Sequence, residues 1–442
     1  MHLKTAKTTY PRVSRGDIFK DMKNMSIELL SPAGDMEKLK SALLYGADAV
    51  YMAGNVFGMR AAATNFSTEQ IFEATTYAHS LGKKIYLTVN TMPHWYEYEI
   101  LEKYLYDIKD ANIDALIVSD LGVFETVRKI LPDMEIHVST QANSVSHAAC
   151  NAWHKLGASR IVLARELNFD EIKAIRQRIP KELELECFIH GSMCISYSGR
   201  CLISGNLNNR DANRGACSQP CRWNYKMYEI EEEKRPNERM PVIETDEGTF
   251  IMASKDMCMI EHIPDLMECG INCFKIEGRM RSAYYTACVT NAYRMAIDTY
   301  NKDKENYIYN PLWKRELESV SHREYHTGYF YDKVNEVPNI SSGNKNVCEQ
   351  SYFAVAEGYN SEKGMAYFRQ RNKFKIGDKV EILSPGKTGR PFTVQEIYNE
   401  KNEPIDSAQH PGMYVYVKTP FEVKEGDIMR SAIDLLSFEE RK

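Results

Sequence analysis

A short pattern recurs between residues 46 and 278 of this chain: a helix-stopping residue, then an apolar run, then a polar ending. Its four copies are GADAVYMAG at 46–54, NIDALIVSD at 112–120, GASRIVLAR at 157–165 and GINCFKIEG at 270–278. A helix end followed by an almost wholly apolar run is typical of a parallel strand that is covered on both faces. The polar residues after each run are therefore expected at the carboxyl end of a strand.

Four further apolar runs lie between these copies, separated by intervals long enough for a helix, at 27–30, 84–90, 135–139 and 183–189. Ser67 and Gln70 have the spacing of a capping box, and Gly82 indicates where the helix that they begin should end. The eight strands favour an α/β fold, a (βα)8 TIM-like barrel over residues 26–300. An open, doubly wound sheet is the alternative.

Two regions follow the barrel. Residues 301–350 are rich in Tyr, Asn and Lys with little apolar periodicity, and we predict a connecting segment. Residues 351–442 contain short alternating runs separated by glycines, which predicts a small antiparallel β-barrel domain. We expect this domain to bind a partner and not to carry the chemistry.

The N-terminus and the hydropathy of the whole chain both bear on where the protein is located. The N-terminal tail, residues 1–25, contains basic residues but no apolar stretch of the signal-peptide kind. No run of the chain approaches the length that spans a membrane. We therefore expect a cytoplasmic protein that makes no membrane contact.

A cysteine-rich insertion at about 190–260 contains Cys194, Cys201, Cys217, Cys221 and Cys258. Thiols among polar neighbours are good ligands, and the total of eleven cysteines is odd, so they cannot all form intramolecular disulfides. The spacing lacks the paired C-x2-C units of common zinc sites and matches no ferredoxin pattern. It leaves an iron-sulfur cluster, a structural zinc ion and unligated thiols as alternatives. Four other cysteines lie in apolar patterns and are predicted core residues: Cys187, Cys269, Cys273 and Cys288.

Polar side chains stand at the predicted strand ends, where barrel enzymes place their chemistry. If the barrel forms, these residues converge on one mouth: Asn90, Gln141, Asn143, Arg165, His190, Lys275, Glu277, Arg279 and Arg281. The candidate catalytic residues among them are Gln141, Asn143, His190 and Glu277. The alternatives are that the two amides satisfy loop backbone, that His190 is a core histidine, and that the last two arginines cap a helix or pair with Glu277.

The formal net charge of -5 gives no global attraction for nucleic acid, so RNA binding requires local basic patches. One candidate patch lies in the cysteine block and comprises Arg200, Arg214 and Arg222. A second has basic residues at every other position, which on a strand places them on one face beside Tyr367: Arg369, Arg371, Lys373 and Lys375. A solvated barrel surface is the alternative for the second patch.

Several segments together resemble the collagenase-like "unknown-type" peptidase family. They are 29–35, 186–205, 209–223, 275–285 and 322–328, and the resemblance extends from about residue 27 through the C-terminal domain. The cysteine block is the most specific part. The segment 322–328 contains His322-Arg-Glu-Tyr-His326, whose Glu is misplaced for a zinc-protease helix, so a surface or RNA-facing loop is expected there.

The resemblance implies an iron-sulfur RNA hydroxylase. Family members of this long form hydroxylate the wobble uridine of tRNA to 5-hydroxyuridine without dioxygen, with prephenate as the hydroxyl donor. By position, the ligands of a [4Fe-4S] cluster would be Cys194, Cys201, Cys217 and Cys258, with Cys221 as the alternative to Cys217. The cations expected near the two carboxylates of prephenate are Arg165, Lys275, Arg279 and Arg281.

The resemblance also implies tRNA and prephenate as partners, with a paralogous family protein as a further candidate. Two other functions stay open at this point. One is a collagenase-like peptidase, for which the sequence shows no nucleophile-base or metal-water arrangement. The other is a noncatalytic RNA-binding protein with a structural zinc ion.

Overall fold

The computed structural model describes residues 27–59, 64–194, 196–223, 254–332 and 350–432, together with the backbone of four short strands within 230–249. The predicted N-terminal tail lies outside the described residues. The four short strands form two antiparallel pairs, β8 (Ile230–Glu231) with β9 (Arg239–Met240) and β10 (Glu244–Thr245) with β11 (Gly248–Thr249).

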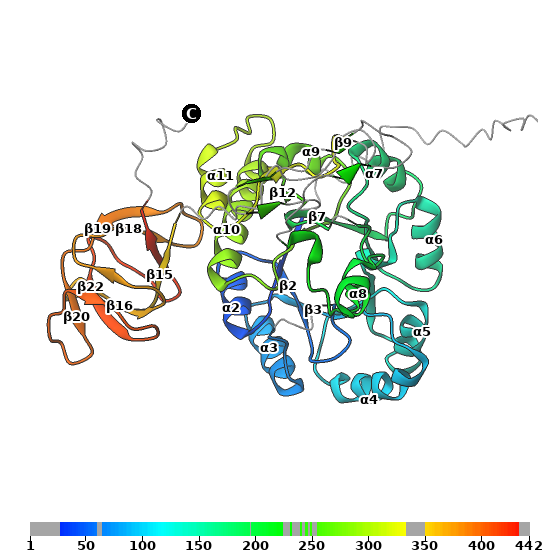
Figure 1. The fold of residues 1–442 in the computed structure, drawn as a ribbon, viewed down its shortest axis with the longest axis horizontal. Coiled ribbons are helices and arrows are strands. Elements are labelled where there is room, and N and C mark those ends of the chain that lie inside the picture. The colour runs from blue at the N-terminus through cyan, green and yellow to red at the C-terminus, as the bar shows by residue number, and fades with distance from the viewer. Residues whose placement is uncertain are drawn as a thin grey trace, which may run out of the picture.

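Parallel strands close into a barrel, which confirms the predicted fold class (Figure 1). The neighbours run in chain order, and the last strand pairs with both the first and the seventh, so the ring has no free edge. The eight strands are β1 (Glu28–Pro32), β2 (Ala49–Ala53), β3 (Lys84–Val89), β4 (Ala115–Val118), β5 (Glu135–Val138), β6 (Arg160–Val162), β7 (Glu184–Ser192) and β13 (Cys273–Ile276). Each one coincides with a predicted apolar run.

Helices surround the barrel (Figure 1), and their apolar faces pack on the strands. The predicted capping box is present: the Ser67 hydroxyl accepts from the Gln70 amide, and the Gln70 side chain accepts from the Ser67 amide. The helices of this layer are α2 (Met36–Leu44), α3 (Thr68–Ser80), α4 (Tyr98–Ile108), α5 (Leu121–Ile130), α6 (His147–Lys155), α7 (Phe169–Arg176), α9 (Ile263–Met267), α10 (Ala283–Lys302) and α11 (Pro311–Glu318). Helix α11 falls in the predicted connecting segment, where Trp313 and Leu317 are buried, so part of that segment belongs to the barrel domain.

Two additional strands extend the barrel sheet beyond β7. Strand β12 (Asp256–Cys258) runs antiparallel to β7, and β14 (Tyr325–His326) runs parallel to β12. His322 and Arg323, just before β14, are buried. The surface loop expected for the 322–328 motif is therefore wrong: the motif begins in the core and continues into a short, half-buried strand.

The C-terminal domain is an antiparallel sheet in the order β19-β18-β23-β15-β16-β22-β20, curved into a half-barrel, with the pair β17–β21 beside it. Its strands are β15 (Tyr352–Asn360), β16 (Met365–Gln370), β17 (Phe374–Lys375), β18 (Lys379–Leu383), β19 (Arg390–Thr393), β20 (Ile397–Asn399), β21 (Ser407–Ala408), β22 (Tyr414–Lys418) and β23 (Ile428–Ser431). Within the described residues β19 and β20 do not pair with each other, so the small barrel is open.

A buried charge joins this domain to the barrel. The Arg430 guanidinium is fully buried and lies 2.6 Å from the Glu316 carboxylate of α11 and 3.0 Å from Glu381. Removing the guanidinium would leave the buried Glu316 carboxylate without its cation, and breaking a buried ion pair in this way typically costs about 3–5 kcal/mol. In the described part of the chain, no helix is both long enough and apolar enough to cross a membrane.

Candidate active site

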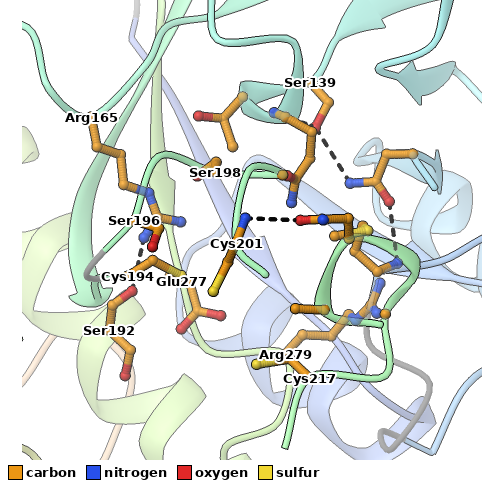
Figure 2. A pocket seen from close by; sticks show the side chains of 18 of the residues that line it. Ser139, Arg165, Ser192, Cys194, Ser196, Ser198, Cys201, Cys217, Glu277 and Arg279 are labelled. Carbon is orange, nitrogen blue, oxygen red and sulfur yellow. Dashed lines mark hydrogen bonds between the residues drawn. The ribbon is translucent and has the colours of Figure 1, made fainter. Parts of the chain in front are cut away.

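A cavity of about 590 Å³ opens at the carboxyl ends of the barrel strands. Its floor comes from strands and strand ends, including Tyr51, Thr88 and Phe188, and its wall comes from the segment between Cys194 and Arg222 (Figure 2). That wall holds the short helices α8 (Ile203–Asn208), η3 (Ala212–Arg214) and η4 (Pro220–Arg222). The cysteine block therefore covers the face where barrel enzymes bind their substrates.

The turn after β5, which includes η2 (Thr140–Ala142), positions the cysteine loop. The Asn143 amide donates to the Ser198 carbonyl at 2.8 Å and to the Gln141 carbonyl at 3.0 Å. Gly199 has a φ of +70°, and a side chain there would begin 2.6 Å from Gln141 Oε1, so glycine is favoured at this position. These contacts hold the loop between Cys194 and Cys201 over the cavity.

Four thiols face this cavity: those of Cys194, Cys201, Cys217 and Cys221. Cys194 and Cys217 are exposed, while the other two are half-buried. Burial raises the pKa of Cys221, Arg222 opposes that shift, and the three neighbouring thiols add to it. The backbone amide of Gln219 donates to Cys217 Sγ at 3.3 Å. Such N–H···S bonds also accompany the sulfur ligands of iron-sulfur clusters.

The fifth cysteine lies elsewhere. Cys258 is on β12, opposite His190 of β7, and is 8% exposed in the core behind the barrel wall. Burial raises the pKa of its thiol to about 12. It does not line the cavity, so the structure brings together four of the five candidate ligands and includes Cys221 in place of Cys258.

His190 also points away from the cavity, although simple alternation along β7 would turn it inward with Glu186 and Phe188. The pairing of β7 with β13 shifts register between Lys275 and Ile276, so β7 carries an extra residue at a β-bulge. Beyond the bulge the imidazole packs against the rings of Tyr285, Tyr293 and Tyr325. The structure thus places His190 in the core, in line with the alternative of a core histidine.

The predicted substrate-binding cations line the cavity. Arg165 donates to the Ser192 carbonyl at 2.8 Å, with its guanidinium 3.8 Å from the centre of the Phe188 ring. Arg281 donates to the Ser192 hydroxyl at 3.1 Å. Arg279 is buried and donates to the Thr88 hydroxyl at 3.1 Å.

Lys275 is a buried cation of the cavity lining, and it is partly neutralised. Its ammonium group lies 2.6 Å from the buried carboxylate of Glu186. Burial would raise the pKa of Glu186, but the charges of Lys275 and Arg160 lower it to about 2. Lys275 therefore lines the cavity beside an ionised carboxylate partner.

Arg323 also lines the cavity, and the sequence analysis missed it. Its guanidinium forms a buried ion pair with Asp256 of β12, which also lies 3.4 Å from Arg281. Arg323 belongs to the sequence motif at 322–328, but that motif was predicted to be a surface loop. Among the predicted catalytic residues, Gln141 and Glu277 line the cavity, whereas Asn143 and His190 do not.

The predicted RNA-binding residues of the cysteine block differ in their surroundings. Arg200 is exposed, between the cavity-lining residues Gly199 and Cys201. Arg214 forms an ion pair with Glu97 in η1 (Trp95–Glu97). Arg222 donates to the Met193 carbonyl at 3.1 Å and lines the cavity.

The second predicted patch does not form as one strand face. Strand β16 ends at Gln370, before three of the four basic residues. Arg369 pairs with Glu357 at 3.0 Å, and Arg371 pairs with Glu37 of α2 in the barrel domain. Lys373 and Lys375 are exposed beyond the strand end. Arg371 therefore helps to dock the domains, while Arg369 lies 4.0 Å from the same Glu37 carboxylate and pairs within its own domain.

The residues at the mouth fit an iron-sulfur cluster by their chemistry, because four thiols from one segment face one cavity. Within the described residues, however, no three His, Cys, Asp or Glu side chains are already grouped closely enough to hold a metal ion. The thiols would have to close in on a bound group, and they lie on short irregular elements whose neighbours include four residues with positive φ: Gly199, Asn209, Gly215 and Gln219.

The fold and the site define an α/β-barrel protein whose mouth is covered by a thiol-bearing segment and lined with cations. The chain belongs to peptidase family U32: the model of that family matches residues 34–338, and the model of the peptidase family U32 C-terminal domain matches residues 349–430.

Three relatives of this chain carry different functional names. "tRNA hydroxylation protein P1" of Bacillus subtilis is 37% identical over 91% of this chain and 94% of its own length. "23S rRNA 5-hydroxycytidine C2501 synthase" of Escherichia coli is 38% identical over 62% of this chain and 39% of its own length. "Collagenase" of Porphyromonas gingivalis is 31% identical over 81% of this chain and 86% of its own length.

Proposed function

We propose that this protein is an RNA-modifying enzyme that hydroxylates the wobble uridine of tRNA to 5-hydroxyuridine without dioxygen. The observation that carries the proposal is the cavity at the barrel mouth, where four thiols and several cations meet. The name of the B. subtilis relative, which matches over nearly its whole length, supports hydroxylation of tRNA. The name of the E. coli relative supports hydroxylation of a pyrimidine base.

The proposed ligands of a [4Fe-4S] cluster are the four thiols that face the cavity: Cys194, Cys201, Cys217 and Cys221. When bound, the cluster would supply a one-electron route beside the substrate. The Gln219 amide would remain as a donor to the sulfur of Cys217, and Asn143 would hold the loop at Ser198. A zinc ion on the same thiols is the alternative that elemental analysis distinguishes.

The proposed hydroxyl donor is prephenate, which carries two carboxylates. Arg165, Arg279 and Arg281 line the cavity and would bind them, because guanidinium groups match carboxylates with paired N–H donors. In the transfer, the C5–H bond of uracil becomes C5–OH, the pyrimidine loses two electrons, and the donor gains them as its C–OH carbon becomes C–H. Glu277 and Gln141 line the same cavity and would orient the base, since the Gln141 side-chain oxygen has no hydrogen-bond partner among the described residues.

A peptidase function, which the family name and the P. gingivalis relative suggest, has less support. None of the described residues that line the cavity is a histidine. The serines and cysteines there therefore lack the imidazole base of the Ser–His and Cys–His peptidases. His190 is in the core and cannot take that role without refolding the wall of the barrel.

The test is mass spectrometry of tRNA from a deletion strain grown without oxygen, with any oxygen-dependent hydroxylase also removed. The deletion should abolish 5-hydroxyuridine, and so should a block in prephenate synthesis upstream of chorismate. The wild-type gene should restore the nucleoside, and Cys201→Ala should not. The protein isolated anaerobically should be brown, with about four irons and four sulfides per chain. Unchanged 5-hydroxyuridine in the deletion strain would contradict the function, and stoichiometric zinc without visible absorbance would contradict the cluster.

A further inference from the structure

The loop between β3 and α4 exposes an aromatic group. The Trp95 side chain is 85% exposed and the Tyr96 side chain is 55% exposed. The His94 ring stacks on Tyr96 with centroids 5.6 Å apart, and Trp95 meets Tyr96 edge to face at 5.8 Å. Burying a tryptophan is among the largest apolar gains available to a chain, so a ring left this exposed is available to a partner.

This aromatic group stands at the rim of the cavity. The loop follows the carboxyl end of β3, on the same face of the barrel as the mouth. Glu97, two residues after Trp95, pairs with Arg214 of the cysteine block. Asn213 and Gly215 on either side of that arginine both line the cavity. Figure 1 shows α8, which belongs to the same block, inside the ring of helices that includes α4.

The charges near the aromatic group favour RNA as the occupant. Arg200 is exposed on the cysteine loop between two cavity-lining residues. The nearby carboxylate of Glu97 is neutralised by Arg214, and that of Asp211 accepts from the Asn213 amide. Flat rings on the same rim as an exposed cation match unpaired bases joined by phosphates. A duplex would hide its base faces from these rings.

The enclosed position of the cavity explains why aromatic rings would be needed at its rim. A base whose carbon is modified inside a closed cavity has to leave the base stack, and its neighbours then lose a stacking partner. Rings at the rim can replace that partner. We propose that Trp95 and Tyr96 form a stacking platform for the unpaired bases that flank the nucleotide held in the cavity; this inference rests on the proposed function and deepens it.

The test measures the affinity of the full chain, isolated anaerobically, for an RNA stem-loop with an unpaired loop. The double variant Trp95→Ala/Tyr96→Ala should bind at least about tenfold more weakly, because stacking on one aromatic side chain accounts for roughly that much per base. The salt dependence of binding should be unchanged, since no phosphate contact is lost. Trp95→Phe/Tyr96→Phe keeps the rings and should retain most of the affinity.

Two controls make the result specific. Tyr106→Ala removes another exposed aromatic ring, 57% exposed, which lies about two turns into α4. This variant should bind as the wild type does. A fully paired RNA of the same stem should not distinguish the wild type from the double variant.

Affinity for the stem-loop within twofold of the wild type in the double variant would overturn the platform and assign the rings to a protein partner. A loss that Tyr106→Ala shares equally would also overturn it. Because binding is measured without turnover, the two proposals can fail separately. If the wild type hydroxylates no RNA but the double variant still loses affinity, the proposed function fails and the platform stands.

Discussion

Strand β7 separates two environments, and cysteines occur in both. On its inner face Glu186 contacts Lys275 and Phe188 lines the cavity, and the strand then runs into the loop that carries Cys194. On its outer face Cys187 is buried beneath the helical layer, and His190 lies opposite Cys258. The same residue type is therefore accessible on one side of a single strand and enclosed in the core on the other.

Thiol reactivity should show the largest difference between these two environments. Burial raises the pKa of Cys258, and likewise of Cys269 and Cys288, to about 12. At pH 8 their thiolate population is then about a thousandfold below that of an ordinary exposed cysteine. A neutral alkylating reagent on metal-free protein should therefore label Cys194 and Cys217 first, as peptide mapping by mass spectrometry would show.

Denatured protein supplies the control for this labelling, because all thiols should then react at similar rates. Labelling of Cys258 in the folded protein as fast as that of Cys194 would break the distinction between the two faces. It would mean that β12 opens readily from β7.

Metal content should show the next largest difference. It tests two cysteines that the family resemblance treated differently, with Cys258 as a ligand and Cys221 only as the alternative to Cys217. Cys221→Ala should lose most of the iron of anaerobically isolated protein, because Cys221 faces the cavity with three other thiols. Cys258→Ala should keep the iron and lose only about 1 kcal/mol of stability, as is usual for a small change in a core. Iron and sulfide analysis, with thermal unfolding on the same samples, measures both effects.

The opposite result would reassign the ligands. If Cys258→Ala loses the iron while Cys221→Ala keeps it, the loop and β12 must rearrange when the cluster binds. The set of cluster ligands implied by the family resemblance, which includes Cys258, would then be correct. Cys150→Ala serves as a control, since Cys150 is buried in α6, away from the cavity-lining residues.

Local patterns predicted the barrel because each strand repeats one signal, a helix end followed by an apolar run. The strand ends then placed Gln141, Arg165 and Glu277 at the mouth, where the structure has them. The same rule predicted the wrong direction for His190, because a β-bulge in β7 shifts the alternation of inward and outward side chains. No residue type in a buried strand indicates where such a bulge will form. The alternation of side chains along a strand predicts their direction only where the strand is regular.

Contacts between segments that are distant in the sequence also could not be predicted. The basic residues after Tyr367 looked like a free patch, yet Arg371 pairs with Glu37, a residue more than three hundred positions earlier in the chain. The position of Cys258 depends on β12 pairing with β7 across the cysteine block. Neither pairing follows from local propensity, because each requires the two elements to be placed first.

The smallest of the expected differences concerns the pH dependence of stability on the outer face of β7. In the unfolded chain a histidine gains a proton below about pH 6.5. In the folded protein burial lowers the pKa of His190 to about 3, against the opposing charge of Asp256. Only the unfolded state therefore takes up the proton between these values, and stability falls as the pH is lowered. Between pH 7 and pH 5 this one group should cost about 2 kcal/mol.

The variant His190→Gln should remove this part of the pH dependence while retaining a polar group beside Tyr293, whose hydroxyl lies 3.3 Å from the imidazole. Burial also lowers the pKa of His137, so the slope should decrease and not vanish. The pKa of Glu186 is lowered too, but a carboxylate of that kind contributes only below about pH 4.5, outside the window. Denaturant unfolding at pH 7 and pH 5 measures the slope for both proteins. Equal slopes would mean that His190 reaches solvent in the native state, and the outer face of β7 would then be less closed than its burial indicates.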